Sequence, residues 1–128
     1  MRRLTQPPNN RHSVRVTDLG MFERRLVERF ERCHVSPGGE VWVQRADALA
    51  ALQLGEELDR TLLGMEGFIV GASGVYPSLG RIADFSGLPD ARAYSRARAL
   101  LADAWAEPPD DVHPDAEGDY MIDLVVAE

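Results

Sequence analysis

Apolar residues recur at intervals of three and four positions in two stretches of the chain, as they do along one side of an amphipathic helix. The first stretch predicts a helix over residues 19–34, with the apolar positions Leu19, Phe22, Leu26, Phe30 and Cys33. The second predicts a helix over residues 90–106, with the apolar positions Tyr94, Ala97, Leu101 and Trp105. Residues 47–60 predict a third helix with a less regular stripe and core positions at Leu49, Leu52 and Leu58.

Strands are indicated where apolar and polar residues alternate, or where a short apolar run stands between turns. We expect strands over residues 40–44, 61–70 and 120–127. The second should contain a bend or bulge, because Gly64 and Gly67 interrupt it. After a turn at 71–74, we expect a short antiparallel strand at 75–77 and a helical turn at 78–85. Residues 13–16 could add a short edge strand.

The order of these elements predicts an α+β domain in which helices cover one small mixed β-sheet, in two layers. The strand at 40–44, the helix at 47–60 and the strand at 61–70 would form a βαβ unit. The length of 128 residues is that of one domain. We therefore expect a mobile polar arm over residues 1–12 and a single domain over 13–128. Its core should unite Leu26, Phe30, Ile69, Leu101, Trp105 and Leu124.

The charge balance narrows the classes of partner. The chain has 21 acidic and 14 basic residues, a formal net charge of −7, and no lysine. Broad binding to nucleic-acid phosphates needs a basic face, so this class is disfavoured, whereas a basic protein partner is compatible with the charge. The single Cys33 excludes an intramolecular disulfide and a cysteine zinc cluster. Because no apolar stretch approaches the length of a membrane span and the first residues lack a signal-peptide core, we expect a cytoplasmic protein.

Phosphate-binding and hydrolase motifs are missing from the glycine-rich segment at 64–86. A Walker loop needs a lysine, and a Gly-x-Ser-x-Gly elbow does not occur, because Ser73 is followed directly by Gly74. The three histidines are scattered. The loop residues Asp110, Asp111, His113 and Asp115 have suitable ligand types for a divalent cation, but their spacing matches no EF-hand. We therefore expect neither a metal nor a cofactor.

Two carboxylates could carry acid–base chemistry in an alternative, enzymatic interpretation. Glu66 lies within an apolar strand, and Asp84 precedes Phe85 and Ser86. Partly buried carboxyl groups can acquire raised pKa values and act as a pair in a pocket behind the glycine-rich turn. In the structural interpretation, Glu66 faces solvent or pairs with an arginine such as Arg81, and Asp84 caps a turn.

Part of the chain, residues 47–86, resembles a known group. A helix containing Glu56-Glu57 leads into the strand Gly64-Met65-Glu66-Gly67-Phe68, followed by Tyr76-Pro77-Ser78-Leu79 and Asp84-Phe85-Ser86. This arrangement resembles small bacterial immunity-type proteins of polymorphic toxin systems. The resemblance implies an acidic binding protein, acting as a monomer or homodimer, that neutralises a cognate toxin and has no catalytic residues. An acidic inhibitor of this kind suits a basic toxin.

If the chain binds such a partner, its outward-facing carboxylates should steer association. Two groups meet this description, one near the end of the second helix and one in the loop that precedes the last strand. An aromatic anchor and a basic residue at the 74–81 turn complete the predicted partner-binding set, which is Glu56, Glu57, Asp59, Tyr76, Arg81, Asp110, Asp111 and Asp115.

Overall fold

A computed structural model describes residues 3–5 and 15–127 of the chain. Within them, six strands form one sheet in the order β1-β2-β3-β6-β4-β5. β1 and β2 are parallel and all other neighbours are antiparallel, so the sheet is mixed, as predicted. The strands are β1 (Arg3–Thr5), β2 (Arg32–Val35), β3 (Val41–Gln44), β4 (Leu62–Gly71), β5 (Gly74–Asp84) and β6 (Asp119–Val126).

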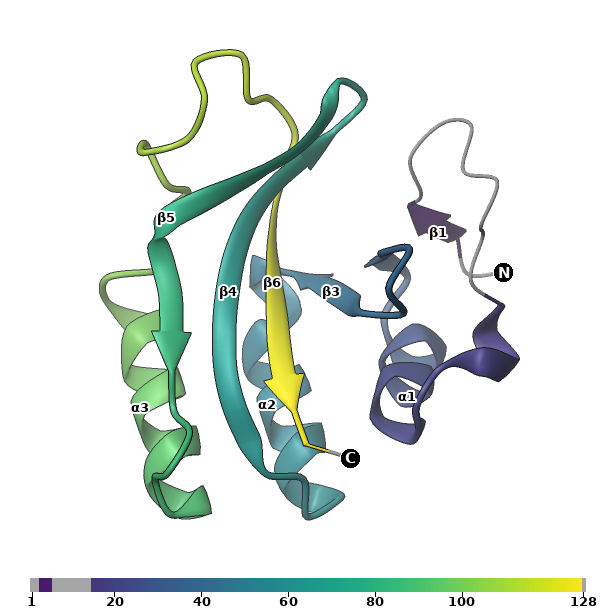
Figure 1. The fold of residues 1–128 in the computed structure, drawn as a ribbon, viewed down its shortest axis with the longest axis vertical. Helices are drawn as coiled ribbons and strands as arrows, with labels where there is room; N and C mark the ends of the chain where they lie inside the picture. Colours follow the sequence, from purple (N-terminus) through teal and green to yellow (C-terminus); the bar gives the residue numbers. More distant parts are fainter. Residues whose placement is uncertain (1–2, 6–14, 128) are drawn as a thin grey trace.

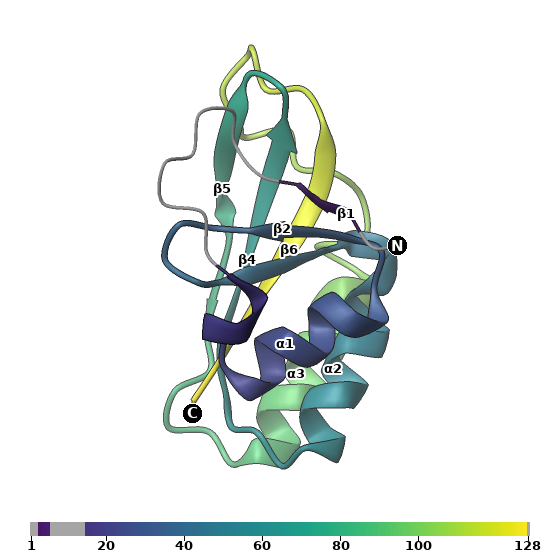
Figure 2. The same ribbon diagram turned by 90° about the vertical axis from the view of Figure 1, so that its right-hand side faces the viewer.

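Three helices pack on one side of this sheet, and short 3₁₀ turns precede two of them (Figures 1 and 2). The sheet twists strongly, so that β2 crosses β4 and β5 at a steep angle (Figure 2). The α+β class and the two-layer arrangement are therefore confirmed. The helices are α1 (Met21–Arg29), α2 (Ala48–Glu57) and α3 (Asp90–Ala102), and the 3₁₀ turns span Val16–Asp18 and Arg45–Asp47.

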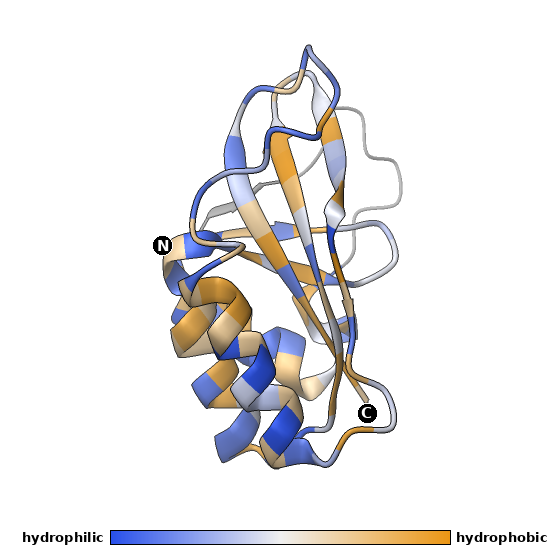
Figure 3. Cartoon of the chain, turned by 90° about the vertical axis from the view of Figure 1, so that its left-hand side faces the viewer, coloured by the Kyte–Doolittle hydropathy of each residue, from blue (hydrophilic) through white to orange (hydrophobic). Residues whose placement is uncertain are grey.

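The core lies between the helices and the sheet. It contains all six residues predicted to share it, Leu26, Phe30, Ile69, Leu101, Trp105 and Leu124. The stripe of α3 is also buried as expected. Figure 3 shows hydrophobic stretches in the strands of the sheet, interrupted by hydrophilic residues.

The first predicted helix is too long. α1 ends at Arg29, Phe30 adopts an extended conformation (φ −113°, ψ 132°), and β2 follows. Cys33 is buried in this strand rather than on a helix. Residues 33–35 pair with 41–43 of β3, and the glycines at 38 and 39 allow the hairpin between them. The cross-strand pairing thus overrides the helical spacing of Cys33.

The helical turn predicted at 78–85 is also wrong, because β5 runs from Gly74 to Asp84 and pairs with β4 over most of that length. The expected break in β4 takes the form of register shifts between Leu62 and Gly64 and between Glu66 and Phe68. Leu49 is 46% exposed and so lies outside the core, whereas Leu52 is buried.

Two further differences concern connectivity. β3 and β4 flank α2 in the chain, but β6 lies between them in the sheet, so they do not form an adjacent βαβ pair.

Of the predicted N-terminal arm, residues 3–5 form β1, and the remainder lies outside the described residues. The same is true of residues 13 and 14 in the predicted edge strand, whereas Val16 begins a 3₁₀ turn. No described helix has the length and apolar character needed to span a membrane.

Candidate functional site

The second face of the sheet carries no described helix, and we call it the open face. One row of residues crosses it from β2 to β5, because each member is directly opposite the next in the strand register: His34, Trp42, Asp123, Glu66 and Ile82. Residues opposite one another in neighbouring strands project to the same side of a sheet. The register therefore brings two carboxyl groups between an aromatic and an aliphatic side chain.

Aromatic packing occupies the β3 side of the open face. The Trp42 and Phe68 rings stack with centroids 4.0 Å apart and planes 6° from parallel. The His34 ring lies 4.8 Å from Trp42 at a tilt of 35°. Met121 and Val70 join the tryptophan in a small apolar cluster, separate from the core beneath the helices. This part of the open face is therefore apolar and closely packed.

Asp123 is the most unusual group of the open face, because its carboxyl group is almost completely buried, with 4% of the residue exposed. Burial raises the pKa of Asp123 to about 8, and the negative charges of Glu40 and Glu66 add to the effect. The protonated carboxyl donates a hydrogen bond to Glu40, and the charge of Glu23 contributes least. Asp123 is therefore neutral at neutral pH and surrounded by carboxylates.

A small cavity of about 120 Å³ adjoins this group. Asp123 lines it from β6, Glu40 from the position just before β3, and Glu23 from the first turn of α1. The remaining lining comes from the last residues of β6 and from Val41. The electrostatic character of this region is therefore negative, and it favours cationic groups.

Exposed apolar side chains lie on β5, at the other side of the row. Ile82 is 58% exposed and Val75 is 38% exposed. Both are opposite open-face residues of β4, Glu66 and Val70. Leu79 is 79% exposed at the middle of the same strand. Ile82 therefore presents an exposed aliphatic side chain directly opposite Glu66.

The structure does not bring the two predicted acidic groups together. Glu56, Glu57 and Asp59 lie at the end of α2, and the loop that contains Asp110 and Asp115 lies at the opposite end of the molecule (Figures 1 and 2). They therefore cannot contact one small partner surface at the same time.

The α2 group is partly engaged within the chain. Glu56 forms an ion pair with Arg98 of α3. Glu57 is exposed and accepts a hydrogen bond from Gln53 at 3.2 Å. Asp59 is exposed in the turn that follows, with a left-handed φ of 55°. Of the three carboxylates, Glu57 and Asp59 are thus the ones presented to solvent.

In the loop, Asp111 has a structural role. Its carboxylate accepts hydrogen bonds from the Ser78 hydroxyl and from the Gly80 N–H, both at 2.6 Å. These bonds hold the pKa of Asp111 below its ordinary value and attach the loop to the middle of β5. Asp110 and Asp115 remain exposed.

The predicted turn residues are also anchored. The Tyr76 hydroxyl lies 3.0 Å from the Ser73 hydroxyl, and its ring stacks on His113 at 5.9 Å. Arg81 donates to the Tyr120 hydroxyl at 3.1 Å and to the Glu107 carbonyl at 3.2 Å. A Cβ added at Gly67 would lie 2.8 Å from the Arg81 Cβ, so this glycine lets the arginine cross the strand.

Glu66 and Asp84, the two carboxylates of the enzymatic interpretation, have different surroundings from those that this interpretation requires. The Asp84 carboxylate is exposed and accepts from the Ser86 hydroxyl (2.6 Å) and N–H (2.9 Å), which lowers its pKa. This is the turn-capping geometry. The residue directly opposite Glu66 on β6 is Asp123, whose carboxyl group the sequence interpretation did not select.

Asp123 could have been found from the sequence, because it interrupts the apolar run YMIDLVV in a strand that must be buried. A charged residue at such a position is rarely tolerated without a specific environment. Glu40 and Glu23 carry no comparable indication, since their proximity to Asp123 depends on the tertiary fold.

Among residues 3–5 and 15–127, no group of three or more His, Cys, Asp or Glu side chains is arranged to hold a metal ion. Comparisons of the chain with protein-family models, curated proteins and solved structures found no match.

Proposed function

We propose that this chain is a binding domain that recognises a basic protein through the open face of its sheet. The observation that carries the proposal is the cross-strand pair Glu66 and Ile82, which places a carboxylate beside an exposed aliphatic side chain on a face without a described helix, next to the buried Trp42 and Asp123. A partner that presents Lys or Arg next to an apolar residue would complement this surface.

The net charge of −7 supports the choice of partner, because it attracts basic proteins over distances comparable to the Debye length. The resemblance of residues 47–86 to immunity-type proteins suggests the biological role of this binding. In that role, the partner is a toxin, and the chain neutralises it by occupying its basic surface.

The test begins with affinity capture from the native host, followed by reconstitution with the purified partner. Glu66→Gln/Ile82→Ala should weaken the affinity by about tenfold or more, because it removes one charge and one exposed aliphatic group from the open face. The matched control is Glu57→Gln/Leu49→Ala on α2, which removes the same kinds of group from an exposed helix surface and should leave the affinity unchanged.

The kinetics give a second criterion. Association with the wild-type chain should slow as salt is raised, and the open-face variant should lose part of this dependence. If instead the α2 variant loses affinity and the open-face variant does not, recognition lies at the Glu57 and Asp59 end.

Neutralisation is tested by coexpression of the captured partner in a bacterial host. The partner should arrest growth alone, and the wild-type chain should restore growth more fully than Glu66→Gln/Ile82→Ala. A partner that is harmless when expressed alone would contradict the toxin interpretation but not the binding surface.

A further inference from the structure

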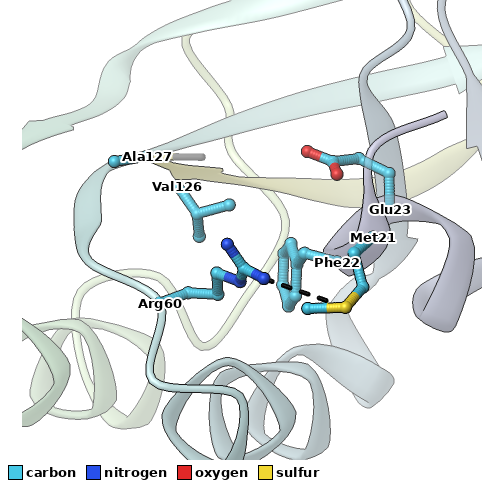
Figure 4. Close-up of a pocket in the computed structure, with 6 residues that line it drawn as sticks. All are labelled: Met21, Phe22, Glu23, Arg60, Val126 and Ala127. Carbon is cyan, nitrogen blue, oxygen red and sulfur yellow. Dashed lines mark hydrogen bonds between the residues drawn. The ribbon is translucent and has the colours of Figure 1, made fainter.

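A second cavity, of about 230 Å³, lies where the start of α1 approaches the end of β6. Its lining residues come from three separate parts of the chain: Met21, Phe22, Glu23, Arg60, Val126 and Ala127 (Figure 4). Most of these side chains are apolar. The cavity is therefore an apolar pocket that contains one guanidinium and one carboxylate.

Arg60 has a fixed backbone and an unsatisfied side chain. Its N–H donates to the Gly55 carbonyl at 2.9 Å, and its carbonyl accepts from the Tyr94 hydroxyl at 2.8 Å. The guanidinium points between Phe22 and Val126 (Figure 4), where Nη2 lies 3.8 Å from the thioether sulfur of Met21. A thioether is a weak acceptor for a charged donor.

The Nε atom of Arg60 is buried and has no hydrogen-bond acceptor. In the part of the chain that the structure describes, Arg60 also forms no ion pair. A buried donor without an acceptor is costly, and in native proteins such a group calls for a specific explanation, such as a bound ion or water molecule. A carboxylate complements a guanidinium group, because its oxygens accept charge-assisted hydrogen bonds from the N–H groups of an arginine.

We propose that this pocket binds a small aliphatic monocarboxylate, with its carboxylate on Arg60 and its hydrocarbon chain against Phe22, Val126 and Met21. This inference is independent of the proposed function, because the pocket and the open-face row share no residue. The cavity volume limits the size of the ligand, since pockets for drug-sized molecules start at about 300 Å³. Glu23 limits its charge, because a second negative group on the ligand would approach this carboxylate.

The probe for the test is 4-methylpentanoate, titrated into the ¹⁵N-labelled chain near neutral pH. Resonances of residues 21–23, 60 and 126–127 should shift in a saturable manner. Two comparison ligands separate the contributions. 4-Methylpentan-1-ol keeps the hydrocarbon chain without the charge, and glutarate adds a second carboxylate. Both should bind at least about tenfold more weakly than the probe.

Arg60→Gln should weaken binding of the probe by about tenfold or more, and Arg60→Lys should recover only part of the loss because it lacks the planar pair of donors. Arg25→Gln is the matched control, since it removes the same charge from an exposed position of α1. Thermal unfolding of each variant shows that it is folded, and the ligand series on the wild-type chain tests the site without any substitution.

Four outcomes would overturn the proposal. Three are the absence of saturable shifts with 4-methylpentanoate, equal binding of the alcohol, and unchanged binding in Arg60→Gln. The fourth is glutarate binding as tight as that of the probe, which would contradict a monocarboxylate site.

Discussion

The two faces of the sheet are built from the same strands but have different chemistry. On the helix side, Cys33, Val43, Met65 and Ile122 are completely buried and apolar. On the open face, the neighbouring positions of those strands are His34, Trp42, Glu66 and Asp123. The hydrophobic effect is sufficient to account for the first set. It does not account for a buried carboxyl next to other carboxylates, so the open face has a composition that stability alone does not favour.

The helix-side face should respond most strongly to truncation. Leu101→Ala should destabilise the protein by about 2–5 kcal/mol, because the side chain is fully buried between α3 and the sheet. Denaturant titration measures this loss. A loss below about 0.5 kcal/mol would be typical of a surface position and would contradict the packing described for α3.

Asp123 should make the open face sensitive to pH. Its pKa is raised in the folded protein to about 8 from an ordinary value of 3.8, so the folded state holds a proton that the unfolded state releases. The stabilisation from this proton is full below the ordinary value and is lost as the pH rises toward the folded value.

Asp123→Asn removes this titration with little change in shape. Its stability relative to the wild type should increase by about 1.4 kcal/mol between about pH 6 and 7, the value for one proton. Chemical denaturation of both proteins at several pH values provides the measurement. A constant difference across this range would show that Asp123 is ionised in the folded state.

Ile82→Ala should have the smallest effect on folding, within about 0.5 kcal/mol, because the side chain is largely exposed. Thermal unfolding and partner affinity should be measured on the same samples. A clear loss of affinity at unchanged stability would separate the function of the open face from its packing. A loss of stability comparable to that of Leu101→Ala would instead show that Ile82 belongs to a core.

Much of the core could be predicted from the sequence because the pattern of apolar residues along an element indicates which side chains are buried. The buried stripe of α3 follows from helical periodicity, and β3, β4 and β6 follow from alternation or from short apolar runs between turns. Cys33 shows the limit of this inference, since its spacing from Phe30 suits a helix while its pairing with Val43 makes it part of a strand. The spacing of apolar residues along the chain does not report the free energy gained when a segment pairs with another strand.

The arrangement of the acidic residues was harder to predict from the sequence than the core was. Carboxylates near the end of α2 and in the loop before β6 are recognisable as polar positions, but nothing in the sequence says that these two segments lie at opposite ends of the molecule. The contacts of Asp123 with Glu40 and Glu66 depend on the strand order, in which β6 lies between β3 and β4. An aspartate inside an apolar strand indicates from the sequence that Asp123 is unusual, but it does not identify the residues around it.

The central place of β6 also affects how the chain folds. Trp42 of β3 and Asp123 of β6 are cross-strand neighbours although they are separated by roughly 80 positions, and such distant pairings slow folding. During synthesis, β3 and β4 leave the ribosome well before their shared neighbour. Until β6 joins them, each presents an unpaired edge that can associate with other chains. Nascent chains should therefore pass through an aggregation-prone interval, and chaperone binding to them should decrease once residues 119–126 have emerged.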